Sequence, residues 1–207
     1  EAVVEDLEVK NSLWRELEQI CSAQTIFASN TSSLTIAEMA AATQRPDRLI
    51  GLHFFNPVAV MPLVEVVRTI ATDPQVVRTA LEFAMSLGKE AIESGDRPGF
   101  VVNLLLVPFM MDAIRAVEQQ IAPIEDIDRG MRLGAGHPMG PLALCDFVGL
   151  DTLDRIGEIM FREYREKRYA SPPLLRRMVA LGYLGKKVGR GFYDYTREPV
   201  TATEAPP

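Results

Sequence analysis

The sequence is short of the features that would tie it to a membrane, an oxidising compartment or a nucleic acid. Its two cysteines, Cys21 and Cys145, lack the paired spacing of disulfide frameworks and zinc sites, which predicts a reducing, cytoplasmic location and no bound metal. The longest apolar run, residues 100–111, is well below the ~20 residues that a membrane-spanning helix needs. A net charge of −6 leaves no broad basic surface for phosphate backbones, so neither a membrane nor a nucleic acid is expected as a partner.

The sequence does hold enough apolar material for a substantial core. With 47% hydrophobic and 24% charged residues, its 207 residues suffice for one large domain or two small ones. In the first part, helical periodicity alternates with short β-prone runs, as it does in α/β folds. The expected helices are 7–20, 36–42 and 74–87, and the expected strands are 25–28, 49–55, 63–70 and 90–94.

From Pro98 onward the pattern is helical only. Asp96 is the expected N-cap of a long helix that runs to about Gln120, and further helices are expected at 124–133, 150–165 and 173–181. We therefore divide the chain into an α/β domain at 1–95, a helical domain at 96–200 and a disordered tail at 201–207. The first helix of the helical domain is apolar on nearly every side, which predicts contact with a second subunit and a homodimer.

The start of the chain has an incomplete pattern. Glu1 is followed at once by Ala2, Val3 and Val4, which are typical of the last residues of a buried strand. We therefore expect the chain to be truncated at its N-terminus, with earlier strands of its first domain ahead of Glu1.

Of the two histidines, His53 has a candidate partner. If strands 49–55 and 63–70 pair antiparallel about a connection centred near Ala59, His53 lies directly opposite Glu65. A carboxylate that accepts a hydrogen bond from one ring nitrogen leaves the other nitrogen to take a substrate proton, which is the arrangement of a general base. From the pairing alone, a catalytic pair and a half-buried structural histidine are equally favoured.

Three other polar residues are weaker candidates on their own. His137 lies in a loop rich in glycine and proline, where residues serve backbone shape, and we expect it to be structural. Asn103 interrupts an apolar run and needs a hydrogen-bonding partner, either a substrate or, more commonly, a neighbouring backbone group. Ser32, in the polar cluster 29–33, is most simply a cap of the next helix unless it converges with His53.

Several motifs stand in a shared order and spacing. They are Phe-Ala-Ser-Asn-Thr-Ser-Ser-Leu at 27–34, Gly-Leu-His-Phe-Phe-Asn-Pro at 51–57, Leu-Val-Glu-Val-Val at 63–67, Arg-Pro-Gly-Phe-Val-Val-Asn at 97–103, the glycine- and proline-rich segment 133–141, and Gly-Arg-Gly-Phe-Tyr at 189–193. In this register the sequence resembles the L-3-hydroxyacyl-CoA dehydrogenase family across essentially all of the chain except the tail.

The resemblance implies a fold and a reaction. The fold is the C-terminal portion of a Rossmann-type domain followed by an all-α dimerisation domain. The reaction is the NAD-dependent interconversion of an L-3-hydroxyacyl-CoA and a 3-oxoacyl-CoA, in fatty-acid metabolism. By similarity, His53 takes the hydroxyl proton and Glu65 holds His53, while Ser32 and Asn103 donate hydrogen bonds to the reacting oxygen.

The resemblance also implies the cofactor contacts. It assigns NAD to Glu5, Lys10, Ser32, Asn56 and Lys187, although composition alone would make the three charged residues solvated surface groups. The sequence contains no G-x-G-x-x-G turn for the pyrophosphate, and we expect that turn, with the residue that distinguishes NAD from NADP, ahead of Glu1. The sequence therefore does not decide between NAD and NADP as the cofactor.

A second hypothesis belongs to a different class. The chain could be a truncated, catalytically incompetent relative that folds through its helical domain and has a structural role as a dimer. The presence of Ser32, His53, Glu65 and Asn103 together argues against long decay of an active site. The two hypotheses differ in whether the protein turns over an acyl-CoA.

Overall fold

The structure is a computed structural model that describes residues 1–203 of the chain. The described residues form two compact units, residues 1–102 and the residues from Asn103 onward, which we call the first and second units. Each unit has its own buried core.

The first unit is an α/β structure built on a four-stranded sheet in the order β1-β2-β3-β4. β1 pairs parallel with β2, β2 pairs antiparallel with β3, and β3 pairs parallel with β4. The adjacent antiparallel strands β2 and β3 confirm the hairpin predicted from the sequence. The strands are β1 (Phe27–Ser29), β2 (Leu49–Phe54), β3 (Leu63–Arg68) and β4 (Glu90–Gly95).

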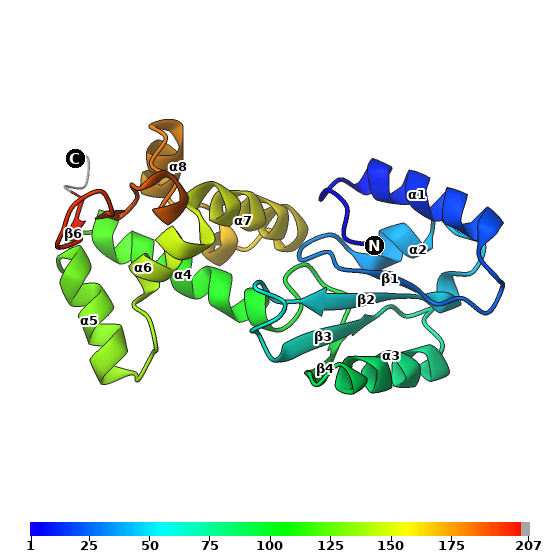
Figure 1. The fold of residues 1–207 in the computed structure, drawn as a ribbon. Helices are drawn as coiled ribbons and strands as arrows, with labels where there is room; N and C mark the ends of the chain where they lie inside the picture. The colour runs from blue at the N-terminus through cyan, green and yellow to red at the C-terminus, as the bar shows by residue number, and fades with distance from the viewer. Residues whose placement is uncertain (204–207) are drawn as a thin grey trace. The chain divides into compact units, whose positions relative to one another are not determined.

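Helices cover both faces of this sheet (Figure 1). α1 (Leu7–Ile20) and α2 (Ile36–Ala40) lie on one face, and α3 (Pro74–Ser86) covers the other. Successive strand residues point to opposite faces, so Leu49 and Val67 join the core under α1 and α2, whereas Ile50 and Val66 join the core under α3. By the same alternation His53 and Glu65 belong to the α1 and α2 face.

Gly51 allows α2 to approach the sheet closely. A Cβ atom at this position would lie 2.8 Å from Cβ of Val67 and 3.0 Å from Cδ1 of Ile36, which are both buried. Any larger residue would push α2 away from β2. The short 3₁₀ segment η1 (Pro46–Arg48) then leads directly into β2.

Asp96 caps a helix, but a different one from the helix predicted. Its two carboxylate oxygens accept hydrogen bonds from the N–H groups of Ile36 and Ala37, both at 2.7 Å, so Asp96 caps α2 from across the chain. Residues Gly99 and Phe100 have φ angles of +87° and +49°, which are incompatible with a right-handed helix. The long helix α4 (Val102–Glu118) therefore begins later than the sequence suggested.

The second unit is a helical assembly around one core. Its helices contribute five fully buried side chains to this core: Met111, Ile114, Leu142, Leu153 and Met160. One of its helices, α6, was not predicted, because the glycine- and proline-rich residues before it hid its apolar pattern. The elements are α4, α5 (Ile124–Gly134), α6 (Pro141–Val148), α7 (Leu150–Tyr164), α8 (Pro173–Ala180), and the 3₁₀ segments η2 (Lys167–Tyr169) and η3 (Lys186–Val188).

The C-terminal segment is ordered further than the sequence suggested. The expected disordered tail starts at residue 201, yet Thr201 and Ala202 form strand β6, which pairs antiparallel with β5 (Tyr193–Asp194). The N–H of Thr203 also donates a hydrogen bond of 2.8 Å to the carbonyl of Phe192. These backbone bonds hold residues that composition alone would leave free. The rest of that prediction, 204–207, lies outside the described residues.

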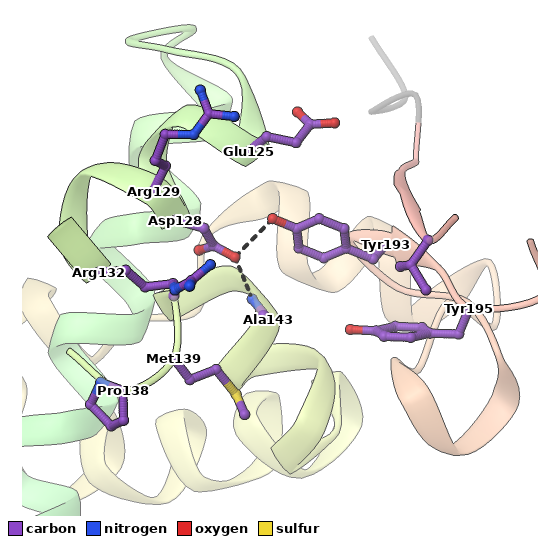
Figure 2. Close-up of a pocket in the computed structure, with 11 residues that line it drawn as sticks. Glu125, Asp128, Arg129, Arg132, Pro138, Met139, Ala143, Tyr193 and Tyr195 are labelled. Carbon is purple, nitrogen blue, oxygen red and sulfur yellow. Dashed lines mark hydrogen bonds between the residues drawn. The ribbon is translucent and has the colours of Figure 1, made fainter. Parts of the chain in front are cut away.

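Two buried aspartates attach this C-terminal segment to the helices, and Figure 2 shows the first of them, Asp128. Asp128 of α5 accepts hydrogen bonds from the N–H groups that begin α6 and from the Tyr193 hydroxyl, which is 2.8 Å away. Gly140 permits this approach, because a Cβ there would lie 2.2 Å from Cγ of Asp128. Asp146 of α6 accepts from the N–H groups of Phe192 and Tyr193 and from the Tyr195 hydroxyl.

The Asp146 carboxyl gives a pH-dependent contribution to stability. Asp146 is 1% exposed, and burial raises its pKa to about 6. Between about pH 4 and 6 the folded state holds a proton that the unfolded state releases, so this contribution is largest in acid and falls as the pH rises. We expect the stability of the native protein relative to Asp146→Asn to fall by on the order of 2–3 kcal/mol from pH 4 to 7.

Urea unfolding at a series of pH values measures this difference. Glu158→Gln, which alters an exposed carboxylate of α7, is the matched control and is expected to show little pH dependence. A stability difference between native protein and Asp146→Asn that is flat from pH 4 to 7 would contradict the raised pKa.

Candidate active site

His53 and Glu65 form a buried pair at the centre of the β2–β3 hairpin. The strand register places them directly opposite each other, as the sequence predicted, and Nδ1 of His53 lies 2.7 Å from Oε2 of Glu65. Only 6% of His53 and none of Glu65 is exposed. Because Nδ1 faces a carboxylate, Nε2 is the ring nitrogen left for proton exchange with another molecule.

The second oxygen of Glu65 is also engaged. Oε1 accepts hydrogen bonds of 3.0 Å from the N–H groups of Val101 and Val102, where α4 begins. A buried carboxylate is costly unless it is hydrogen-bonded, and here both of its oxygens have partners, while the helix N-terminus favours negative charge. Glu65 is therefore fixed at three points, and its fixed carboxylate sets the orientation of the His53 ring.

Aromatic rings enclose the imidazole. The ring centroids of Phe55 and Phe100 lie 4.6 and 5.4 Å from that of His53. Phe100 is 2% exposed and has the left-handed backbone conformation that precedes α4. Sequence reasoning missed these two phenylalanines and the two N–H donors of Val101 and Val102 as parts of the site. The sequence did offer an indication of them, because Phe55 lies in the motif at 51–57 and the other three residues lie in the motif at 97–103.

The turn after β1 brings Ser32 to the same end of the sheet as His53. β1 and β2 run parallel, so the polar cluster 29–33 and the end of β2 emerge at one edge. Oδ1 of Asn30 accepts a 2.8 Å hydrogen bond from the N–H of Phe54, which ties this turn to the residue after His53. Ser32 does not cap the next helix, because the α2 N–H groups bond to Asp96 instead.

Glu5 and Lys10, expected from composition to be solvated, lie against this turn. Oε1 of Glu5 accepts hydrogen bonds from the Thr31 hydroxyl, the Ser32 N–H, and the N–H and hydroxyl of Ser33. Lys10 is 1% exposed, and its ammonium group donates to the Glu1 carboxylate at 2.9 and 3.0 Å. Lys10 is therefore buried in the first unit, and Glu5 is partly exposed with its carboxylate bonded to the turn.

The remaining predicted residues are Asn56, Asn103, Lys187 and His137. Asn56 is exposed just beyond β2. Asn103 lies in the first turn of α4, and Lys187 forms an ion pair with Asp151 at 2.5 Å. Both residues belong to the second unit, so their convergence with His53 stays a prediction. The His137 ring packs on Phe109 with centroids 5.0 Å apart, in keeping with the structural role expected for it.

Two classes of site have no counterpart in the part of the chain that the structure describes. Across residues 1–203, no three histidine, cysteine, aspartate or glutamate side chains gather where they could hold a metal ion. Within the same residues, no helix has the length and apolar character to cross a bilayer.

Comparison with protein-family models gives two adjoining matches. Residues 1–97 match the NAD-binding domain of 3-hydroxyacyl-CoA dehydrogenase, and residues 99–195 match the C-terminal domain of 3-hydroxyacyl-CoA dehydrogenase. Together the two models span nearly all of the described chain.

Individual relatives agree. The chain is 54% identical over 197 residues to a 3-hydroxybutyryl-CoA dehydrogenase of Mycobacterium tuberculosis, covering 94% of this chain and 69% of that protein. It is 50% identical to the human mitochondrial hydroxyacyl-coenzyme A dehydrogenase, covering 94% and 62%. The crystal structure of M. tuberculosis FadB2 matches with a TM-score of 0.91 and 53% identity, covering 93% of this chain and 68% of that one.

Proposed function

The chain belongs to the 3-hydroxyacyl-CoA dehydrogenase family of NAD-dependent enzymes, and we propose that it interconverts an L-3-hydroxyacyl-CoA and the corresponding 3-oxoacyl-CoA with His53 as the acid/base. The observation that carries this proposal is the buried His53–Glu65 pair, whose carboxylate is also bonded to the start of α4. A structural histidine would not need a carboxylate held at three points. The names of the relatives support an acyl-CoA substrate, and we propose a role in fatty-acid metabolism from the family resemblance.

The protein's own contribution to the reaction is proton transfer and orientation. In the oxidation, Nε2 of His53 takes the proton of the 3-hydroxyl group, and Glu65 holds the ring and balances the positive charge that forms on it. In the reduction, the imidazolium returns that proton to the carbonyl oxygen. The rings of Phe55 and Phe100 pack beside the imidazole, which is 6% exposed. Bound NAD supplies the hydride acceptor for oxidation and, as NADH, the donor for reduction.

The residues at this edge of the sheet fit the nicotinamide end of the cofactor. Dinucleotides bind at the carboxyl ends of parallel strands, and the Ser32 turn and Asn56 follow β1 and β2 at that edge. Their hydroxyl and amide groups are suited to the carboxamide and ribose hydroxyls. We propose that Ser32 and Asn56 make these contacts. From the family resemblance, we propose that Glu5 and Lys10 also bind the cofactor. Asn103, for the reacting oxygen, and Lys187, for the cofactor, are proposed from the family resemblance.

Turnover of a thioester substrate tests the proposed function. The complete gene product that carries this sequence should oxidise NADH in the presence of acetoacetyl-CoA, and free acetoacetate should be a much poorer substrate. A protein that binds NADH and is folded but leaves acetoacetyl-CoA unchanged would favour the structural, non-catalytic hypothesis. Comparison of NADH with NADPH in the same assay determines the cofactor preference.

We propose a homodimer formed through the second unit. Several large apolar side chains of that unit are exposed, among them Leu105, Leu133, Phe147 and Leu181, and a subunit contact would remove such side chains from water. Sedimentation velocity should give twice the mass of one chain, and a monomer at micromolar concentration would contradict the proposal.

A cytoplasmic location stays a prediction, which cell fractionation tests.

A further inference from the structure

We propose that Phe100 is a positioning residue, whose buried ring holds the backbone in the conformation that directs two N–H groups at Glu65 and so orients the His53 ring. The proposal rests on the proposed dehydrogenase function and deepens it, because it names the residue that keeps the acid/base pair in place. Three observations carry it: the backbone conformation at Phe100, the burial of its ring, and the contacts of the two residues that follow it.

The backbone between β4 and α4 makes a turn with two successive left-handed residues. The φ angles are +87° at Gly99 and +49° at Phe100, and the N–H of Phe100 donates a hydrogen bond of 2.9 Å to the carbonyl of Arg97. Glycine adopts a positive φ freely, whereas a residue with a Cβ atom is strained there. Such strain persists only where the surrounding structure holds the residue in place. The rest of the first unit must therefore hold Phe100 in this conformation.

The ring of Phe100 provides that hold. Phe100 is 2% exposed and belongs to the core under α1 and α2, together with Trp14, Ile36 and Val67. These three residues come from α1, α2 and β3, so helices and sheet both contribute to the core that receives the ring. Burying a phenylalanine side chain contributes at least as much free energy as one left-handed residue costs. The buried ring therefore offsets the strain of its own backbone.

The left-handed turn determines where the next two N–H groups point. Those of Val101 and Val102 both donate hydrogen bonds of 3.0 Å to Oε1 of Glu65. Successive N–H groups of a turn form a concavity suited to an anion, and the fully buried Glu65 carboxylate occupies it. Its other oxygen, Oε2, lies 2.7 Å from Nδ1 of His53. A change in the backbone at Phe100 would thus reach the imidazole through Glu65.

Phe100 also contacts the imidazole directly. Its ring centroid lies 5.4 Å from that of His53, with the two ring planes tilted by 59°. The residue therefore acts on the acid/base pair from two sides, through its ring on the histidine and through its backbone on the glutamate. Displacement of a reacting group by about 1 Å can lower the rate about 10²-fold, so kcat should depend on how firmly this turn is held.

Turnover by alanine variants of two phenylalanines in the complete gene product tests the proposal. Phe100→Ala should lower kcat for acetoacetyl-CoA reduction about 10- to 100-fold, while KM for acetoacetyl-CoA and the dissociation constant of NADH change by less than about 3-fold. Phe27→Ala is the matched control, because Phe27 is 3% exposed in the same core but packs its ring on Trp14. It should lower the free energy of unfolding by a similar amount and change kcat by less than about 3-fold. Equal losses of kcat in the two variants, or native kcat in a folded Phe100→Ala enzyme, would overturn the proposal.

Phe100→Gly separates the role of the backbone from that of the ring. Glycine and alanine both remove the ring, but glycine adopts the left-handed conformation without strain and alanine does not. Phe100→Gly should therefore keep about 3- to 10-fold more of the native kcat than Phe100→Ala, although glycine is the smaller residue. A role in packing alone predicts that glycine is no better than alanine, and that result would contradict the proposal.

Amide hydrogen exchange tests the same contacts without turnover. In the ligand-free protein, Phe100→Ala should accelerate exchange at the amides of Val101 and Val102 at least about 10-fold more than Phe27→Ala does. Phe100→Leu and Phe27→Leu, which retain more apolar surface, give the same comparison if the alanine variants do not fold. Equal exchange within the folded pair would refute the proposal. If the native protein proved inactive with acetoacetyl-CoA, the proposed function would fail, while the exchange measurement would still decide whether Phe100 holds these amides on Glu65.

Discussion

Replacement of His53 by glutamine should lower kcat for acetoacetyl-CoA reduction by about 10²- to 10⁴-fold, the range associated with general acid–base catalysis. Nε2 of His53 is the ring nitrogen that does not face Glu65, and it is the group that we propose carries the proton. A glutamine amide neither takes up nor releases a proton near neutral pH. It does offer an N–H donor to the Glu65 carboxylate, which would otherwise be left buried without that partner.

The loss should appear in kcat and leave binding largely intact. KM for acetoacetyl-CoA and the dissociation constant of NADH are expected to change by less than about 10-fold, because proton transfer belongs to the transition state. His137→Gln is the matched control, since His137 packs on Phe109 in the second unit, and it should keep native turnover. A folded His53→Gln enzyme with native kcat would show that His53 is not the acid/base residue.

The pairing of His53 with Glu65 could be predicted from the sequence because a hairpin has a simple register. Residues equidistant from the centre of an antiparallel connection face each other, and alternating burial then places both on the same face of the sheet. The helices and strands of the first unit were predictable for a similar reason, since their apolar patterns repeat locally. Local patterns along the chain are therefore enough to predict chemistry that depends on two neighbouring strands.

Contacts between distant segments could not be predicted in this way. Asp96 stands where a local N-cap would, yet it bonds to α2, and Gly99 and Phe100 delay α4 by adopting left-handed backbone conformations. Lys10 was an exposed charge by composition, and only the fold reveals that it is buried against Glu1 and Glu5. The partner of Asp96 lies on another element, and the partners of Lys10 lie in the irregular segment before α1, so no periodicity along the chain marks either set of contacts.

Glu65→Gln should also lower kcat severely, although it changes little in shape. The amide oxygen of glutamine can keep the hydrogen bonds from Val101 and Val102, which leaves the amide N–H₂ facing Nδ1 of His53. The opposite rotamer would set an N–H donor against two backbone donors, so the first arrangement is preferred. Nδ1 must then accept a hydrogen bond, and the neutral ring carries its proton on Nε2. That tautomer cannot accept the substrate proton in the oxidation, and a comparable tautomer error in the serine-protease triad costs about 10⁴-fold.

The oxidation of 3-hydroxybutyryl-CoA, followed through NADH formation, is expected to slow about 10²- to 10⁴-fold in Glu65→Gln. The nitrogen-15 chemical shifts of the His53 ring should show that its proton is on Nε2 in Glu65→Gln and on Nδ1 in the native protein. A purely structural role for Glu65 would not produce this change of tautomer. Glu65→Ala provides the contrast: it removes the buried carboxylate that His53, Val101 and Val102 share, so it should lower the free energy of unfolding by about 3–5 kcal/mol. Because His53 and Glu65 act as one unit, His53→Gln combined with Glu65→Gln should be about as slow as the worse single variant. Losses that multiply would mean that the carboxylate affects the reaction by a route other than the imidazole.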